Sequence, residues 1–321
     1  MSAVYDTRRA SIALSIVVPI FNEEESLPVL AERLRPVLDV YGEPYEVLAV
    51  DDGSTDRTPY LLEDLRVVWP QLRIVTLRRN SGHQAALAAG LHRARGAYTV
   101  SIDADLQDPP EVIPDMLTLA RTDGLDIVYG VRTDRSTDTG FKRRTAAAYY
   151  WLMRRMVGSF VPAQAGDFRL LSRPVVDALK SFPDQRQIYR LLIPSLGFPG
   201  GQITYRREER VAGTTKYPLH KMILLALDSI TSFSVVPLRL ATTMGALSLV
   251  VCLAFLTWTL VVYVTGNTLP GWTSLIVTLL FFGAVQLFCL GMLGEYVARI
   301  YNAVQARPTY LVARDTEEEQ Q

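Results

Sequence analysis

The chain has 321 residues, enough for one large α/β domain with an appendage or for two small domains. Its 33 basic and 33 acidic side chains balance, which argues against a nucleic-acid-binding protein, because such proteins normally carry a basic excess. The 2 cysteines, Cys252 and Cys289, lie in apolar runs and form no cluster with histidine, so we expect neither a zinc site nor a disulfide framework.

The N-terminal apolar segment is interpreted as a strand and not as a signal peptide. Arg8 and Arg9 precede an apolar run over residues 12–21, but Pro19 interrupts the run and an acidic stretch follows it. No small-residue cleavage site is apparent. We therefore predict a buried first strand at residues 12–18 and expect the soluble part of the chain to lie in the cytoplasm.

Strand and helix patterns then alternate along the first part of the chain. Apolar segments predict further strands at residues 46–50, 72–77, 97–102 and 126–129. Helical patterns are found at residues 24–40, 54–68 and 84–95. This βαβ alternation is typical of an α/β fold with a mainly parallel, doubly wound sheet. The charged segment 314–321 is expected to be a disordered tail.

Acidic residues gather directly after three of the predicted strands. Glu23 follows the first strand, Asp51 and Asp52 end the second, and Asp103 and Asp105 end the fourth. A single acidic loop residue is more often merely solvated, but ligands of open α/β sheets bind beyond the carboxyl ends of the strands. We therefore expect these three clusters to face one site.

The same segments indicate what such a site binds. No GxGxxG motif follows the first strand and no GxxxxGK[ST] motif is present, which argues against a dinucleotide oxidoreductase and a P-loop phosphotransferase. Asp103 and Asp105 are two residues apart, so in extended backbone their carboxylates share a side and suit one Mg²⁺ or Mn²⁺ ion. Gln107 adds a carbonyl oxygen. The pattern predicts a diphosphate held through a divalent metal.

The C-terminal third predicts a membrane anchor. Residues 240–264 and 272–294 contain no charged side chain, and each run is long enough to cross a bilayer as a helix. Arg239 precedes the first run, Arg299 and Arg307 follow the second, and the loop between them has no Lys or Arg. The positive-inside rule therefore places both termini in the cytoplasm.

A juxtamembrane segment precedes the first span. Residues 216–239 carry apolar side chains at helical spacing, between Pro218 and Pro237. A plain soluble helix would show the same spacing, but the position beside a span favours helices that lie in the membrane interface.

Several motifs in order resemble the family 2 glycosyltransferases with the GT-A fold. Within that family the chain is similar to the polyisoprenyl-phosphate branch, which is like dolichol-phosphate mannosyltransferase, and most similar to the bacterial bactoprenol glucosyltransferases with two C-terminal spans. The segments that carry the resemblance are 17–23 (VVPIFNE), 50–56 (VDDGSTD), 79–84 (RNSGHQ), 103–110 (DADLQDPP), 166–169 (GDFR), 210–217 (RVAGTTKY) and 231–240. Together they cover nearly the whole chain.

The resemblance implies an inverting, metal-dependent hexosyltransferase. It would transfer a hexose, with glucose favoured, from a UDP-sugar to a polyisoprenyl phosphate such as undecaprenyl phosphate, giving a lipid-linked sugar donor for cell-envelope glycosylation. Mannose, galactose and an aminosugar stay open, as do the choice between Mg²⁺ and Mn²⁺ and the formation of a homo-oligomer.

The resemblance also implies roles for individual residues. Those that would hold the nucleotide are Pro19, Phe21, Glu23, Asp51, Asp52 and Asp103. Those that would bind the metal and the diphosphate are Asp103, Asp105 and Gln107. Those that would contact phosphates, the last two at the lipid headgroup, are Arg132, Arg169, Arg210 and Lys216. Asp167 would be the candidate base beside the acceptor oxygen, and Asp105 would share in catalysis.

The implied domain order is a GT-A domain at 1–215, interfacial helices at 216–239, transmembrane helices at 240–264 and 272–296, and a cytoplasmic tail at 297–321. The protein would lie in the cell (inner or plasma) membrane with its catalytic domain in the cytoplasm.

Two alternatives remain open. A processive polysaccharide synthase of the same fold usually carries a Gln-x-x-Arg-Trp motif, whereas here Gln187 and Arg190 are followed by Leu191, and two spans do not easily build a conduit. A non-catalytic membrane scaffold would have no need of the acidic motifs, which are all intact.

Overall fold

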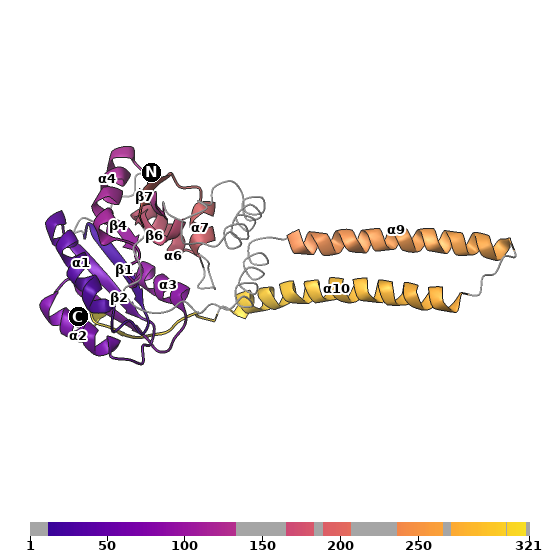
Figure 1. Ribbon diagram of the computed structural model, residues 1–321, viewed down its shortest axis with the longest axis horizontal. Helices are drawn as coiled ribbons and strands as arrows, with labels where there is room; N and C mark the ends of the chain where they lie inside the picture. The colour runs from indigo at the N-terminus through magenta and orange to yellow at the C-terminus, as the bar shows by residue number, and fades with distance from the viewer. Residues whose placement is uncertain are drawn as a thin grey trace. The chain divides into compact units, whose positions relative to one another are not determined.

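The computed structural model describes residues 12–132, 165–182, 189–206, 236–265, 271–305 and 307–318 (Figure 1). The chain divides into two compact units: Met1–Lys216 together with Arg307–Gln321, and Tyr217–Ala306. Arg210, Lys216 and nearly all of the predicted interfacial segment lie outside the described residues.

An 8-stranded sheet forms the centre of the first unit, in the order β7-β5-β6-β4-β1-β2-β3-β8. The strands are β1 (Leu14–Ile20), β2 (Tyr45–Asp51), β3 (Leu72–Leu77), β4 (Tyr98–Ser101), β5 (Ile127–Arg132), β6 (Ala165–Ser172), β7 (Gly200–Tyr205) and β8 (Val312–Asp315). Strands β4, β1, β2 and β3 pair in parallel, as do β5 and β7. Strand β6 runs antiparallel between β4 and β5, and β8 antiparallel to β3. The predicted α/β fold and its parallel strands β1 to β4 are confirmed.

Helices cover both faces of this sheet. They are α1 (Leu27–Tyr41), α2 (Thr58–Val68), α3 (His83–Arg93), the 3-10 turn η1 (Pro110–Val112), α4 (Ile113–Asp123), α6 (Arg173–Lys180) and α7 (Tyr189–Ser195). Alternate side chains of β1 enter different cores: Val18 packs in the core with α1, whereas Val17 packs in the core with α3. A doubly wound arrangement follows from this alternation.

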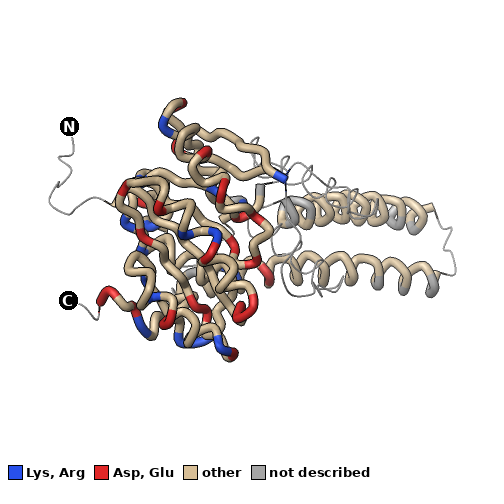
Figure 2. Tube along the Cα trace, turned by 60° about the vertical axis from the view of Figure 1, so that its left-hand side comes forward, with Lys and Arg blue, Asp and Glu red and all other residues tan. Residues whose placement is uncertain are grey.

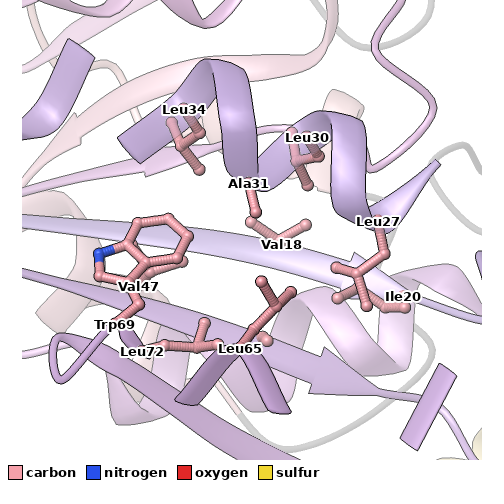
Figure 3. Close-up of a pocket in the computed structure, with 11 residues that line it drawn as sticks. Val18, Ile20, Leu27, Leu30, Ala31, Leu34, Val47, Leu65, Trp69 and Leu72 are labelled. Atoms are coloured by element: carbon pink, nitrogen blue, oxygen red, sulfur yellow. The ribbon is translucent and has the colours of Figure 1, made fainter. Parts of the chain in front are cut away.

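Figure 3 shows the first of these cores, where Leu30 and Leu34 of α1 lie over Val18 and Val47. The gap that remains there, closed on another side by Trp69, has a volume of about 20 Å³ and an apolar lining. It is a packing gap with room for no more than a water-sized group, so it is not a ligand site.

The C-terminal segment is ordered, and the prediction of a disordered tail at 314–321 is wrong for the part that the structure describes. Strand β8 extends the sheet, and the Thr316 hydroxyl oxygen accepts the Ile74 N–H at 3.1 Å. The buried Asp315 carboxylate accepts hydrogen bonds from Arg73 at 2.7 and 2.8 Å and from Arg93 at 3.1 Å. The charges of this segment thus have partners, since Asp315 pairs with Arg73 of β3 and Arg93 of α3. Strand β8 also provides hydrogen-bond partners for the backbone of the edge strand β3.

Replacement of Asp315 by alanine is expected to lower the free energy of unfolding by about 3 kcal/mol, because it breaks a buried ion pair in which Asp315 accepts hydrogen bonds from both Arg73 and Arg93. Denaturant unfolding of the detergent-solubilised protein measures the change. The matched control is Glu318→Ala, an exposed acid in the same segment, which should change stability by less than about 0.5 kcal/mol. Equal effects of the two substitutions would show that Asp315 is not a structural anchor.

The second unit contains α9 (Val236–Val264) and α10 (Trp272–Gln305). Both contain stretches long and apolar enough to cross a membrane. Figure 2 shows that these helices are almost free of charged residues, whereas the first unit carries both signs. Large apolar side chains such as Leu247, Phe255 and Leu287 are exposed, which suits a hydrocarbon environment. Cys252 and Cys289 are free thiols.

Candidate active site

The loops after β1 and β2 are locked together, and this places their acidic residues side by side. Asn22 has a positive φ of 55°, and its backbone N–H donates to the Ser54 hydroxyl at 3.0 Å. Its side-chain oxygen accepts the Thr55 N–H at 2.8 Å. The Glu23 N–H donates to the Thr58 hydroxyl at 2.9 Å. Because asparagine tolerates the left-handed conformation, it suits this junction.

Asp51 and Asp52 are buried and tie neighbouring loops to the end of β2. Asp51 Oδ1 accepts the Ser54 N–H at 2.9 Å. The Asp52 carboxylate accepts the N–H groups of Ser81 and Gly82, at 2.7 and 2.8 Å, where α3 begins. Burial raises the pKa of Asp52, and these two N–H donors only partly oppose that effect. Both acids therefore have a structural role in addition to the nucleotide contact predicted for them.

A cleft of about 270 Å³ opens beyond the carboxyl ends of β1 to β4, where the sequence predicted the site. Its lining residues are Pro19, Ile20, Phe21, Glu23, Asp52, Asn80, Gly82, His83, Ala86, Asp103, Ala104 and Asp105. Six predicted site residues thus come together: Pro19, Phe21, Glu23, Asp52, Asp103 and Asp105. Asp51 and Gln107 are not among the lining residues. The Gln107 N–H donates to Asp105 Oδ1 at 3.2 Å, next to Leu106, which has an unusual positive φ of 58°.

The Asp103 carboxylate has the character of a metal ligand. Burial raises its pKa to about 6, against the opposing effect of His83, and the nearby carboxylates of Asp167, Asp108 and Asp105 raise it further. Its buried Oδ1 has no hydrogen-bond partner within the described part of the chain. An anionic oxygen without a donor, beside a second carboxylate in one cleft, fits a hard divalent cation.

Within the described ranges, no group of three or more His, Cys, Asp or Glu side chains could hold a metal ion on its own. A cation bound by Asp103 and Asp105 would need further oxygen ligands, such as those of phosphate and water. Mg²⁺ in particular is usually bound in this way.

Asp167, the candidate base, lies on β6, and both of its carboxylate oxygens have polar partners. Its Oδ1 is bonded to Arg169, and its Oδ2 lies 3.3 Å from both His83 Nε2 and Gln84 Nε2. Burial acts to raise the pKa of Asp167, but the hydrogen bond from His83 and the charge of Arg169 outweigh it and hold the pKa far below its usual range. Asp167 is thus firmly ionised and only weakly basic, whereas a general base works best with a pKa near the operating pH.

Arg169 does not have the position predicted for a phosphate ligand. Its side chain is 1% exposed, and its guanidinium bonds to Asp167 and to the Tyr189 carbonyl oxygen, the latter at 3.2 Å. Burial lowers the pKa of Arg169, and the Asp167 charge opposes this effect. The arginine therefore supports Asp167 from inside the fold, and its buried Nε has no hydrogen-bond partner in the described part of the chain.

Arg132 has a more accessible position at the end of β5, with its side chain 25% exposed. Its Nη2 lies 3.5 Å from Asp108 Oδ1, and its Nε donates to the Tyr205 hydroxyl at 3.4 Å. That hydroxyl in turn donates to the buried Asp108 carboxylate. Among the residues that the structure describes, an acid and a phenol hold one side of this guanidinium, and its other side can accept a phosphate.

Sequence reasoning missed four residues of this region: His83, Gln84, Asp108 and Tyr205. The first three lie inside motifs that were singled out, RNSGHQ and DADLQDPP, so their positions carried a signal. Tyr205 lies outside every motif, and only the folded chain reveals its contact with Asp108.

Comparison with known proteins agrees with this architecture. The family profile "Glycosyl transferase family 2" matches residues 15–180, and the profile "GtrB C-terminal hairpin" matches residues 236–300. The uncharacterized glycosyltransferase YkcC of Bacillus subtilis is 43% identical over 306 residues, which cover 94% of each chain. The SfII prophage-derived bactoprenol glucosyl transferase of Shigella flexneri is 39% identical over 302 residues, covering 94% of this chain and 97% of that protein.

Among solved structures, glucosyl-3-phosphoglycerate synthase from Mycobacterium tuberculosis, in complex with Mn²⁺, UDP and phosphoglyceric acid, aligns with a TM-score of 0.49. It is 22% identical, and the alignment covers 69% of this chain and 77% of that one. The profile matches and the long relatives, set beside the mixed sheet and its acidic cleft, show that this chain is a glycosyltransferase and belongs to glycosyl transferase family 2.

Proposed function

We propose that this protein transfers glucose from UDP-glucose to a polyprenyl phosphate, such as undecaprenyl phosphate, with inversion at the anomeric carbon. The observation that carries the proposal is an acidic, metal-suited cleft in the same chain as an apolar helical hairpin. Relatives named bactoprenol glucosyl transferase match over nearly the whole length of this chain and support the choice of sugar and lipid.

The donor side of the reaction is assigned to the cleft. Pro19, Phe21 and Glu23 would contact the nucleoside, and Phe21, 41% exposed, offers a ring face for the base. Asp52, which lines the same cleft, would also contact the nucleoside, with Asp51 nearby. Asp103 and Asp105, with Gln107 beside them, would hold Mg²⁺ or Mn²⁺, which when bound offsets the negative charge on the departing nucleoside diphosphate.

The acceptor side needs orientation more than proton removal. A phosphate monoester is already largely ionised near neutral pH, so its oxygen can attack the anomeric carbon directly. The low pKa of Asp167 agrees with this requirement, and we assign that carboxylate to orientation of the groups around the acceptor. Arg132 would bind the lipid phosphate, and Arg210 and Lys216 are proposed to assist it. Arg169 would contribute indirectly, because its guanidinium holds the Asp167 carboxylate in place.

For the membrane part, we propose that α9 and α10 both cross the cell membrane, with the catalytic unit and both termini in the cytoplasm. The length of the two helices and the arginines that flank their apolar runs support this topology. The arrangement brings the catalytic unit to the membrane side where the lipid phosphate lies.

A panel of nucleotide sugars tests the function. Membranes that contain the protein are incubated with undecaprenyl phosphate and one of four donors: UDP-glucose, UDP-galactose, GDP-mannose or UDP-N-acetylglucosamine. Mass spectrometry then gives the mass of the lipid product. We expect the addition of one hexose, from UDP-glucose. Products with several hexoses would favour a processive synthase, and the absence of product from every donor would contradict the proposal.

Asp167→Asn is expected to lower turnover on the order of a hundredfold, with little change in the dissociation constant of UDP-glucose. The substitution keeps the shape but removes the charge that holds Arg169, His83 and Gln84. A loss confined to turnover is the signature of an interaction at the reacting centre. Steady-state rates give the turnover, and calorimetry gives the dissociation constant of UDP-glucose.

The matched control for this substitution is Asp177→Asn, which alters an exposed acid of α6 that pairs with Arg173 on the same helix. It should leave both quantities unchanged. A collapse of donor affinity in Asp167→Asn would instead assign Asp167 to the nucleotide site.

A further inference from the structure

His83 occupies a position in the cleft that no role assigned so far explains. It is the first residue of α3, it lines the cleft, and its side chain is 42% exposed. Its Nε2 lies 3.3 Å from Asp167 Oδ2 and 3.7 Å from Asp103 Oδ1. The imidazole edge therefore faces the space between the metal-type carboxylate and the acceptor-side carboxylate.

The charge of the cleft lining makes this position significant. The lining contains the acids Glu23, Asp52, Asp103 and Asp105, and among the lining residues that the structure describes His83 is the only basic side chain. A diphosphate that enters an acidic cleft needs hydrogen-bond donors as well as a cation, because phosphate oxygens only accept. A divalent ion supplies the cation but no N–H group.

Two backbone donors just before α3 are already engaged. Helix N-termini often bind phosphates through their free N–H groups, but here the N–H groups of Ser81 and Gly82 already donate to Asp52. The His83 side chain is a further donor at this helix start, and it lines the cleft.

The surroundings of His83 also fix its orientation. Asp167 is held by Arg169 through its carboxylate and by the Ser101 hydroxyl through its backbone oxygen, so it offers a rigid acceptor to Nε2. A carboxylate that contacts one ring nitrogen of a histidine sets the tautomer and keeps the proton on that nitrogen. The Nε2–H group is thereby directed to the gap between Asp103 and Asp167.

We propose that His83 Nε2–H, whose contact with Asp167 is long at 3.3 Å and leaves the hydrogen open to a second acceptor, also donates to the diphosphate of the nucleotide-sugar, and that this hydrogen bond becomes stronger as the diphosphate departs. This inference rests on the proposed function and adds a residue to it. In the reaction, the acceptor phosphate oxygen forms a bond to the anomeric carbon, and the bond from that carbon to the diphosphate oxygen breaks. The electron pair of the broken bond stays on the diphosphate, and His83 keeps its proton.

The test compares His83→Gln and His83→Ala with the unaltered protein in membranes. We expect kcat/KM for UDP-glucose to fall about 10- to 100-fold in both variants, the range for loss of a hydrogen bond to a charged group. The dissociation constant of UDP, measured by calorimetry with Mn²⁺ present, should rise by about tenfold, whereas KM for the polyprenyl phosphate should change less than about twofold.

The matched control is His92→Gln on the same helix. His92 contacts the Tyr310 hydroxyl at 3.0 Å and does not line the cleft, so this variant should retain the donor kinetics and the UDP affinity of the unaltered protein. Thermal unfolding of all variants shows whether a loss comes from misfolding, and the glutamine variant keeps a polar side chain at position 83 for that purpose.

Either of two results would overturn the inference: donor kcat/KM and UDP affinity within about twofold of the unaltered protein in both His83 variants, or a loss confined to KM for the lipid acceptor. Failure of the proposed function has a different appearance, because the unaltered protein would then transfer no sugar to the lipid. UDP affinity would still report on His83 in that case.

Discussion

Asp105→Ala is expected to reduce sugar transfer on the order of a thousandfold or more while the protein still folds and inserts. Asp105 lines the cleft beside Asp103, whose buried Oδ1 has no hydrogen-bond partner in the described part of the chain. Loss of one of two carboxylate ligands should remove several kcal/mol of transition-state stabilisation, since the cation no longer lies where charge develops on the diphosphate.

Two measurements check this expectation. Initial rates at saturating Mg²⁺ or Mn²⁺ report on catalysis, and Mn²⁺ binding followed by electron paramagnetic resonance reports on the metal directly. Asp115→Ala, which removes an exposed acid at the start of α4, is the control and should keep both properties. Near-normal turnover of Asp105→Ala with added metal would show that Asp103 and Asp105 do not form the metal site.

Loss of the apolar hairpin is expected to preserve donor binding and to lower activity on a long-chain lipid acceptor. A protein that ends before Arg239 would also lose β8 and the Asp315 contacts with Arg73, and its sheet would have an open edge. A cleaner variant replaces residues 236–306 by a flexible linker and keeps residues 307–321. The catalytic unit then retains the complete sheet that the structure describes.

We expect the linker variant to bind UDP-glucose normally and to act on a short, water-soluble polyprenyl phosphate analogue. On long-chain acceptor in liposomes its rate should fall at least about a hundredfold, because a membrane tether raises the effective concentration of a surface-bound substrate by this order. Equal rates of the linker variant and the unaltered protein on the liposome acceptor would mean that the hairpin only determines location. The plain truncation should unfold at lower denaturant than the linker variant.

Much of the fold was predictable because its first strands are continuous apolar runs separated by amphipathic helices. Strands β6, β7 and β8 were not, for reasons that lie in their composition. Strand β6 contains Asp167 and Arg169, a pair that is tolerable inside a sheet only because the two charges meet each other. Strand β7 begins with two glycines, and β8 is charged at both of its last positions.

The site divides in the same way. Cleft residues that belong to short local motifs, such as Glu23 and Asp103, were predictable from their places at strand ends. Contacts between distant segments were not: His83 meets Asp167 across 84 positions and Asp108 meets Tyr205 across 97. The burial of Arg169 is likewise a tertiary effect, because its Asp167 and Tyr189 partners converge only in the folded chain.

The pairing of β8 with β3 has a consequence for the order of events during synthesis. Arg73 and its partner Asp315 are 242 positions apart, and both apolar helices lie between them in sequence. The ribosome must therefore complete the hairpin before the last edge of the catalytic sheet can close, and such a long-range contact forms late in folding. Until then β3 is an exposed edge open to strands of other chains. A newly made catalytic unit therefore exposes the β3 edge until the chain has been synthesised through β8.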